Sequence, residues 1–503
     1  MSLQRIIVPL SLVLAFVATA ILACDREPSG RPNVLLVTID TLRPDRLGAY
    51  GYDRIETPNI DRLAAEGALF ETALTDTPWT TPSMSSVMTG TYATHHGFKS
   101  TNANRLALEN VTLAEVLAEA GYTTAAIIGS FPLDSIFQLD QGFGHYDDEF
   151  TTPIWSMPGH EFEHIESEFF EAPDRQRFFI LSKALNDSRR EDSEVTEVAL
   201  AWLAKERDEP FFLWVHYFGP HEKPDWRVAE ERRERRRIGM YDPDTENTDR
   251  EVGRLLVGLA EAGLDGNTFV VFHADHGESL GEQGLIGHGQ LLNDASMRVP
   301  LILRYSPRVA AGTRVSGLVR NVDIYPTILD AIGIENEREL SGESLLPLVA
   351  PAGERLWARL TGRAGSERVA YMETYYPAHV AFATPVRLPS GSETKVGLIR
   401  RGVRTRDWKY IRSDPYELID VDPASLPQVP SELAAKLVRE ELYDLTAEKG
   451  ESRNVAQQHP EVVAELREIF EIHLAEEAAT KGTVPGVVDP EMKLRLKALG
   501  YGG

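Results

Sequence analysis

Residues 32–40 read P-N-V-L-L-V-T-I-D, an apolar run that ends at an aspartate. The run has the length of a strand and no apolar–polar alternation, which is typical of a parallel strand buried on both faces. Ligands of such sheets gather beyond the carboxyl ends of the strands. We therefore expect Asp40, the last residue of the run, to lie at a ligand site.

The chain after this strand alternates between helix and strand patterns. Residues 59–67 and 113–121 have helical spacing and end in glycine, and residues 123–128 then read as a strand. The same rhythm continues through the segments 193–206, 210–215, 249–263, 268–274, 299–304 and 322–333. This order predicts a doubly wound, mostly parallel α/β sheet that is flanked by helices.

Two stretches depart from this rhythm. Residues 147–192 are rich in aromatic and charged side chains without clear periodicity, and we expect them to form an insertion that covers the active site. Beyond residue 346, a Gly, Pro and Ser-rich region at 384–392 precedes two hairpin-like strands and a helix, at 395–400, 408–412 and 461–475. The latter pattern predicts a small C-terminal α+β subdomain.

A segment that carries chemistry lies between the first two helix patterns. Residues 77–92 read T-P-W-T-T-P-S-M-S-S-V-M-T-G-T-Y, with cap and first-turn residues at Thr80, Thr81 and Ser83 and a stop at Gly90. A helix should begin at Thr80 or Thr81. Its N-terminal N–H groups would suit a tetrahedral anion bonded to the Thr80 oxygen, so we interpret Thr80 as a nucleophile. An ordinary capped helix is the alternative.

A second cluster, A-D-H-G-E, stands at residues 274–278, directly after a predicted strand. Asp275 offers anionic oxygen and His276 offers imidazole nitrogen, which are ligands of hard and borderline divalent cations. A simple turn would explain this pentapeptide alone. Its combination with Asp40 and Thr80, each placed at the end of a predicted element, favours a metal-dependent site.

These motifs together resemble the sulfatase branch of the alkaline phosphatase superfamily. The family signature is Cys or Ser, any residue, Pro, Ser, Arg, and a helix that closes on Thr-Gly; residues 80–84 here read T-T-P-S-M, and residues 89–90 read T-G. The resemblance spans most of residues 32–480. It implies an alkaline-phosphatase-like catalytic α/β domain over 32–345 and a C-terminal subdomain over 346–480, followed by a tail over 481–503.

The signature differs from the sulfatase pattern at two positions. Sulfatases convert the leading Cys or Ser into formylglycine, and threonine is not a known substrate for that conversion. The resemblance therefore implies that Thr80 acts through its own hydroxyl, as in relatives that cleave or transfer phosphate esters. The sulfatase arginine beside the nucleophile is Met84 here, which leaves Met84 as a possible substrate contact and removes one cation.

The resemblance also implies a ligand set. One divalent metal ion, Mn, Zn, Ca or Mg, would be held by Asp40, Thr80, Asp275 and His276. A second metal held by histidines alone would lack a carboxylate, so we expect a single metal site.

Three further histidines are candidates for substrate contact. His221, in F-G-P-H-E-K-P, matches a family histidine thought to help the leaving group. His288, in I-G-H-G-Q, stands where sulfatases usually place a lysine that contacts the ester. We predict catalytic roles for both, and a possible substrate contact for His216, against the alternative of surface or core histidines.

The resulting hypothesis is a two-step hydrolysis of a phosphate ester. The metal would lower the pKa of the Thr80 hydroxyl, the alkoxide would attack phosphorus, and His221 or His288 would protonate the departing oxygen. Water would then hydrolyse the phosphothreonine intermediate and release phosphate or a phosphomonoester. A site with few cations favours a singly charged phosphodiester. The alternatives are sulfuric ester hydrolysis without formylglycine, phosphoryl-headgroup transfer and a non-catalytic, metal-binding lipoprotein.

Composition and the N-terminus bear on location and partners. A formal net charge of −25 over 503 residues argues against nucleic acid as a partner. Residues 1–23 read as a signal peptide, and the I-L-A-C box resembles that of bacterial lipoproteins, in which Cys24, the only cysteine, would carry a lipid anchor. Residues 24–31 would be a tether, and an uncleaved membrane helix is the alternative. We expect an envelope protein that faces the periplasm or the exterior and acts on a small-molecule or envelope-polymer ester.

Overall fold

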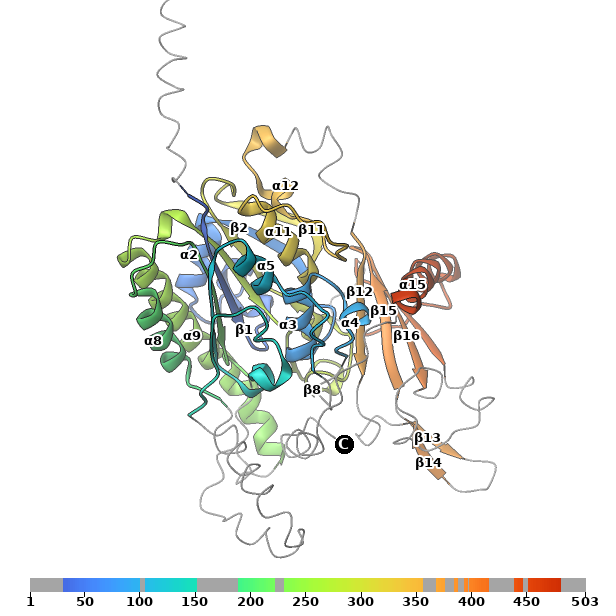
Figure 1. The fold of residues 1–503 in the computed structure, drawn as a ribbon. Coiled ribbons are helices and arrows are strands. Elements are labelled where there is room, and N and C mark those ends of the chain that lie inside the picture. The colour runs from blue at the N-terminus through green and yellow to red at the C-terminus, as the bar shows by residue number, and fades with distance from the viewer. Residues whose placement is uncertain are drawn as a thin grey trace, which may run out of the picture.

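The computed structural model shows an α/β body and a smaller antiparallel sheet beside it (Figure 1). The structure describes residues 30–99, 105–151, 189–221, 230–355, 368–375, 384–387, 393–396, 398–415, 438–446 and 451–480. The predicted signal peptide, the anchor Cys24 and the tail 481–503 lie outside these residues, as does most of the predicted insertion.

The body is built on a sheet whose order is β11-β2-β10-β6-β1-β5-β3-β4, with β9 beside β2. Its strands are β1 (Asn33–Ile39), β2 (Ala68–Leu74), β3 (Thr123–Ile128), β4 (His145–Asp147), β5 (Phe211–Tyr217), β6 (Thr268–Ala274), β9 (Arg298–Val299), β10 (Leu301–Arg304) and β11 (Thr313–Arg320). All pairs are parallel except those of β10 with β2 and β6 and of β2 with β9. The expected mostly parallel sheet is confirmed.

The apolar run within residues 32–40 forms β1, which lies between β5 and β6. All three strands are buried along their whole length, because helices cover both faces of the sheet. Ile39 pairs with Tyr217 of β5 and with Ala274 of β6, so the three strands end at the same level. The residues that follow these strands are thereby brought together at one edge of the sheet.

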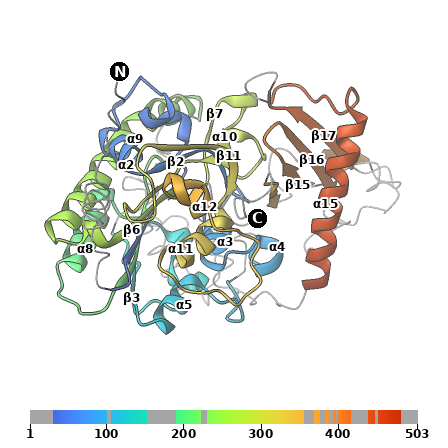
Figure 2. The same ribbon diagram turned by 90° about the horizontal axis from the view of Figure 1, so that it is seen from above.

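Helices pack on both faces of this sheet, and α15 lies in the C-terminal part (Figures 1 and 2). The helices of the described residues are α2 (Pro58–Glu66), α3 (Thr80–Thr89), α4 (Ala93–His96), α5 (Leu113–Glu119), α8 (Asp192–Leu203), α9 (Glu230–Glu261), α10 (Asp294–Met297), α11 (Ile324–Ala331), α12 (Leu346–Val349) and α15 (Pro460–Thr480). Helices α2, α8 and α9 pack together on one face, and α3, α5 and α11 cover the other. Single 3-10 turns are η1 (Pro44–Arg46), η2 (Gly48–Tyr50), η3 (Phe131–Leu133), η4 (Ser135–Phe137), η6 (Asp265–Asn267), η7 (Glu282–Gly284) and η8 (Asn321–Asp323).

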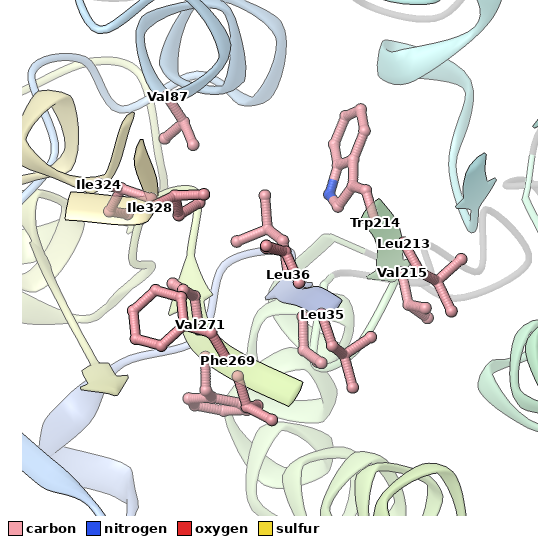
Figure 3. Packing of buried hydrophobic residues seen from close by; sticks show 14 of the residues in the cluster. Leu35, Leu36, Val87, Leu213, Trp214, Val215, Phe269, Val271, Ile324 and Ile328 are labelled. Atoms are coloured by element: carbon pink, nitrogen blue, oxygen red, sulfur yellow. The ribbon is translucent and has the colours of Figure 1, made fainter. Parts of the chain in front are cut away.

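The core of the body lies between the sheet and these helices. Leu36 on β1 lies among buried side chains of neighbouring strands, with Val87 of α3 and Ile328 of α11 on the same side of the sheet (Figure 3). Trp214 of β5 belongs to the same cluster, and its indole Nε1–H donates to Thr38 Oγ1 at 2.8 Å. The one polar atom of this large side chain is therefore satisfied.

The C-terminal part is an antiparallel sheet of order β12-β15-β16-β17, which α15 covers on its outer side (Figure 2). Its strands are β12 (Ala370–Tyr375), β15 (Leu398–Arg404), β16 (Trp408–Pro415) and β17 (Arg439–Asp444), and a separate hairpin comprises β13 (Thr384–Arg387) and β14 (Glu393–Val396). Tyr371, Tyr410 and Phe470 pack between the sheet and α15. The expected α+β subdomain is confirmed, but the predicted strand 395–400 is divided between β14 and β15.

Helix α9 is longer than the segment 249–263 that its pattern predicted. It begins at Glu230 and includes Pro243, a residue that normally marks a helix boundary. The polar first half of α9 has no apolar face comparable to that of its second half, so periodicity alone did not reveal it. Among the described helices, none combines the length and apolarity that a membrane span requires.

We predict that Leu36→Ala lowers the free energy of unfolding by about 2 to 5 kcal/mol, because Leu36 is fully buried on the central strand and its loss leaves a cavity. Urea unfolding of the purified protein measures the change. Leu108, whose exposed fraction is 66%, provides the control, and Leu108→Ala should change the free energy by less than about 0.5 kcal/mol. Equal losses in the two variants would contradict this assignment of the core.

Candidate active site

The site begins where β1 and β6 end side by side. Asp40 follows β1 and Asp275 follows β6, and both carboxylates are fully buried. The backbone turns sharply at Thr41, whose φ of 58° is in the left-handed region that non-glycine residues rarely adopt. In this conformation the Thr41 N–H donates to Asp275 Oδ1 at 3.0 Å. A strained turn and a hydrogen bond therefore fix the two strand ends relative to each other.

The N-terminus of α3 faces these strand ends. The helix starts at Thr80 and stops at Gly90, which has a φ of 68°, so both predicted boundaries are confirmed. Trp79 is the N-cap and makes no side-chain cap hydrogen bond. Thr80 Oγ1 lies 3.3 Å from His276 Nε2. On the same helix, Ser83 Oγ donates to the Asp275 carbonyl at 2.7 Å, which ties α3 to the end of β6.

The four predicted metal ligands form one buried cluster. His276 Nε2 lies 3.6 Å from Asp275 Oδ2 and 3.8 Å from Asp40 Oδ1, in addition to its contact with Thr80. His276 Nδ1 donates to the Gly277 carbonyl at 2.9 Å, so the lone pair of Nε2 faces the two carboxylates. A backbone acceptor of this kind commonly orients a metal-binding histidine.

The electrostatics of this cluster show that it fits a cation. Burial raises the pKa of Asp40 well above its ordinary value, and the neighbouring carboxylates of Asp275, Glu278 and Asp192 raise it further. Burial also lowers the pKa of His276 and so favours the neutral ring. Within the described chain, both oxygens of Asp40 and Oδ2 of Asp275 have no hydrogen-bond partner. Oxygen and imidazole donors around orphaned carboxylates are what a divalent metal requires.

His216 is brought closer to this cluster than the sequence indicated. It lies on β5 opposite Thr38 of β1, and Asp40, His216 and Asp275 can each offer a ligand atom within 4.8 Å of the others. Its Nδ1 is hydrogen-bonded to Thr38 Oγ1 at 2.8 Å, and burial lowers its pKa to about 4, so the ring is neutral. The sequence predicts a possible substrate contact for His216, whereas the geometry makes it a further candidate metal ligand. The signal was a histidine near the end of the strand next to β1.

The two histidines with predicted catalytic roles lie beside the cluster. The ring of His288 is centred 4.4 Å from that of His276 and 5.3 Å from that of His221. His288 Nδ1 donates to Glu278 Oε1 at 3.2 Å, and Glu278 is buried. The sequence showed Glu278 in the A-D-H-G-E motif but gave it no role. The catalytic roles of His221 and His288 stay predictions, and the geometry allows them.

Met84 lies elsewhere than the sequence suggested. It is fully buried in the main hydrophobic core, in the same cluster as Val87 and Met88 of its own helix. This position favours packing over the substrate contact that we considered. A thioether fills an apolar gap, whereas an arginine there would need a partner for its charge.

A buried hydrogen-bond network supports α3 from behind. Asp76 Oδ2 accepts from Ser86 Oγ at 2.7 Å, and Asp76 Oδ1 accepts from Asn321 Nδ2 at 2.7 Å. His96 Nε2 lies 2.9 Å from Ser86 Oγ and donates to it, because Nδ1 accepts from the Phe98 N–H. The segment before Thr80, helix α3 and η8 are therefore held in one arrangement.

The fold and the cluster define an alkaline-phosphatase-like, metal-dependent hydrolase. The chain belongs to the sulfatase family, whose model matches residues 32–334. Among curated relatives, an N-acetylglucosamine-6-O-sulfatase of Bacteroides thetaiotaomicron is 24% identical over 549 aligned positions, covering 88% of this chain and 90% of the relative. An arylsulfatase K of Gallus gallus is 26% identical and covers 91% of this chain and 85% of its own length.

The fold is also shared with solved structures outside the named sulfatases. A phosphonate monoester hydrolase of Agrobacterium radiobacter superposes with a TM-score of 0.61 at 19% identity, over 89% of this chain and 96% of that one. At this identity the likeness concerns the fold. The expectation of a sulfatase-family hydrolase is thus confirmed, and the ester that it cleaves is a separate question.

We predict that Asp40→Asn weakens Mn²⁺ binding by at least about tenfold, because it removes an anionic ligand, and the loss of even a group that only contacts a ligand costs about that much. The same change should raise the melting temperature of the metal-free protein, because it relieves repulsion among buried carboxylates. Thermal melts with chelator and with Mn²⁺ measure both effects. Asp53→Asn, at an exposed position, is the control. Equal stabilisation by Mn²⁺ in wild type and Asp40→Asn would contradict the assignment.

We predict a pH-dependent cost of burying Asp76. Burial raises its pKa from 3.8 to about 6, so the folded state binds more protons than the unfolded state between these values, and stability falls as pH rises. This rise in pKa corresponds to a loss of about 3 kcal/mol in the free energy of unfolding, and the whole loss is present above pH 6. Urea unfolding at pH 4 and pH 7 of the wild type and of Asp76→Asn measures it: the stability difference should shift toward the variant at pH 7. A difference that is independent of pH would show that the cost is absent.

Proposed function

We propose that this chain hydrolyses phosphate esters, and phosphodiesters in preference to monoesters, with Thr80 as the nucleophile. The observation that carries the proposal is the place of Thr80 Oγ1, 3.3 Å from His276 Nε2 and at the start of α3. A hydroxyl at this position is already a nucleophile for phosphorus. Because threonine stands where sulfatases carry the residue that becomes formylglycine, the route through an aldehyde hydrate is not open to it.

The N-terminus of α3 supports an anionic substrate. The first N–H groups of a helix have no partner within it, and Trp79 provides no side-chain cap here. These N–H groups and the helix dipole favour the non-bridging oxygens of a phosphoryl group attached to Thr80. Since Met84 replaces the arginine of the signature, the site holds less positive charge than a sulfatase site. A diester with one negative charge suits it better than a dianionic monoester.

The steps balance as a double displacement. Thr80 Oγ1 loses its proton to solvent and forms a bond to phosphorus, while the bond from phosphorus to the departing alcohol oxygen breaks. His221 or His288 gives that oxygen a proton. Water then attacks phosphorus and returns a proton to this histidine, the bond to Thr80 Oγ1 breaks, and the Thr80 oxygen takes up a proton from solvent. Asp40, Asp275, His276 and Thr80, with His216 as a further candidate, would hold a divalent cation, which would supply Lewis-acid stabilisation of these oxygens.

The comparisons support both this proposal and one alternative. The Agrobacterium protein, which shares the fold, is a phosphonate monoester hydrolase by name, so phosphorus chemistry occurs on this scaffold. The Bacteroides relative, whose alignment covers 88% of this chain, is by name an N-acetylglucosamine-6-O-sulfatase. Sulfate ester hydrolysis directly through Thr80 is therefore the second candidate.

We also propose an envelope location. A lipid anchor at Cys24 would hold the enzyme at a membrane surface, with its substrate among the esters of the bacterial envelope. The support is the sequence of residues 1–24, in which an apolar run precedes I-L-A-C.

We predict that the purified protein cleaves a chromogenic phosphodiester faster than the matched phosphate and sulfate monoesters, and only when Mn²⁺ or Zn²⁺ is present. Thr80→Val keeps the shape of the side chain but removes the hydroxyl, so it should lower kcat at least about a thousandfold. Thr80→Ser keeps the hydroxyl and should retain diester cleavage.

Two outcomes would overturn the proposal. Diester turnover that persists in Thr80→Val would remove Thr80 as the nucleophile. Faster Thr80-dependent cleavage of the sulfate ester would establish the second candidate instead.

A further inference from the structure

The indole of Trp79, the residue directly before Thr80, is enclosed by a segment that contains His288. Trp79 and His288 meet edge to face, with ring centroids 5.6 Å apart at 82°. The next residue, Gly289, packs its backbone on the indole, since a Cβ there would lie 2.2 Å from Trp79 Cζ2. Its φ of 85° also favours glycine. The residue before the nucleophile and the residue after His288 are therefore in direct contact.

A hydroxyl from the C-terminal sheet joins these same two residues. Thr374 lies on β12 with an exposed fraction of 1%, and its Oγ1 donates to the Gly289 carbonyl. The Trp79 Nε1–H donates to the same Oγ1 at 3.2 Å. Because a hydroxyl has a single proton, which goes to Gly289, the Trp79 bond uses an acceptor lone pair. One buried group thus fixes the direction of both hydrogen bonds.

Neighbouring contacts hold the two segments at other points. The Glu373 N–H, on the same strand, donates to the Asp76 carbonyl at 2.8 Å. Lys409 of β16 is fully buried, and its Nζ donates to the Leu292 carbonyl at 2.8 Å and pairs with Asp294 Oδ1 at 2.6 Å. The C-terminal sheet therefore binds both the segment before Thr80 and the segment after His288 through hydrogen bonds and an ion pair.

We infer that Thr374 is a positioning residue of the active site, which sets the distance between the Thr80 hydroxyl and the His288 ring through Trp79 and Gly289. The inference rests on the proposed roles of Thr80 and His288. Thr374 lies outside residues 32–334, the part that the sulfatase model matches. The catalytic geometry of this chain accordingly depends on its C-terminal subdomain, and not on the matched body alone.

The test is Thr374→Val in the full chain, beside Thr374→Ser and wild type, with the phosphodiester as substrate. Valine has nearly the shape of threonine but leaves the Trp79 N–H and the Gly289 carbonyl without their partner. A displacement of reacting groups by a fraction of an ångström to 1 Å should lower kcat by about ten- to a hundredfold, with KM within about twofold. Serine keeps the hydroxyl and should restore kcat to within about threefold of wild type. Mn²⁺ affinity should be unchanged, since Thr374 touches no ligand.

The matched control is Ser413→Ala. Ser413 is a buried hydroxyl of the same sheet, on β16, which within the described chain has no hydrogen-bond partner. Its removal should leave kcat at the wild-type value. Melting temperatures of all variants show whether they are folded, and a loss of kcat in Thr374→Val that Thr374→Ser does not rescue would contradict the inference.

The outcomes separate the inference from the proposed function. If wild type shows Thr80-dependent turnover and Thr374→Val matches it in kcat, the positioning role is wrong and the proposed function stands. If the wild type shows no turnover that depends on Thr80, the proposed function fails, and with it the basis of the inference. A fall in kcat that Thr374→Ser restores, at constant metal affinity, supports the inference.

Discussion

Repulsion between two buried carboxylates is the constraint on which the site depends. Asp40 and Asp275 follow adjacent parallel strands that end at the same level, so the fold places both carboxylates close together in the protein interior. Burial and the neighbouring acids raise the pKa of Asp40, which means that two bare charges there are unfavourable. A bound cation would relieve this cost, and the neutral His276 would complete its donor set. Metal binding would thereby stabilise the fold.

The rest of the body holds this crowded edge in place. Strands β1 and β6 are apolar and fully buried, so water cannot screen the two carboxylates that follow them. Ser83 connects α3 to the carbonyl of Asp275, and Asp76 accepts from Ser86 one turn further along the same helix. Thr80 is consequently carried by a helix with two buried anchoring hydrogen bonds, which limits the movement of its hydroxyl.

The C-terminal sheet also makes hydrogen bonds to residues next to Thr80 and His288. Its contacts with Trp79 and Gly289 run through backbone and side-chain groups whose partners are buried, so a small shift of the sheet would leave polar groups unpaired. The ion pair between the buried Lys409 and the half-buried Asp294 adds to this coupling, because Lys409 belongs to the C-terminal sheet and Asp294 to the body. Glu451, from the C-terminal part, also pairs with Lys409.

The sequence by itself determined the sheet class and the helix at Thr80, which follow from local patterns: continuous apolar runs and a glycine stop. Polar residues placed directly after predicted elements, together with the resemblance to a known family, made Asp40, Thr80, Asp275 and His276 the candidate metal ligands. The role of His216 and the contacts of Trp79, Glu278 and Thr374 came only from the tertiary structure, and so did the core position of Met84. Register between distant strands and contact between separate subdomains are long-range properties, which no short window of sequence encodes.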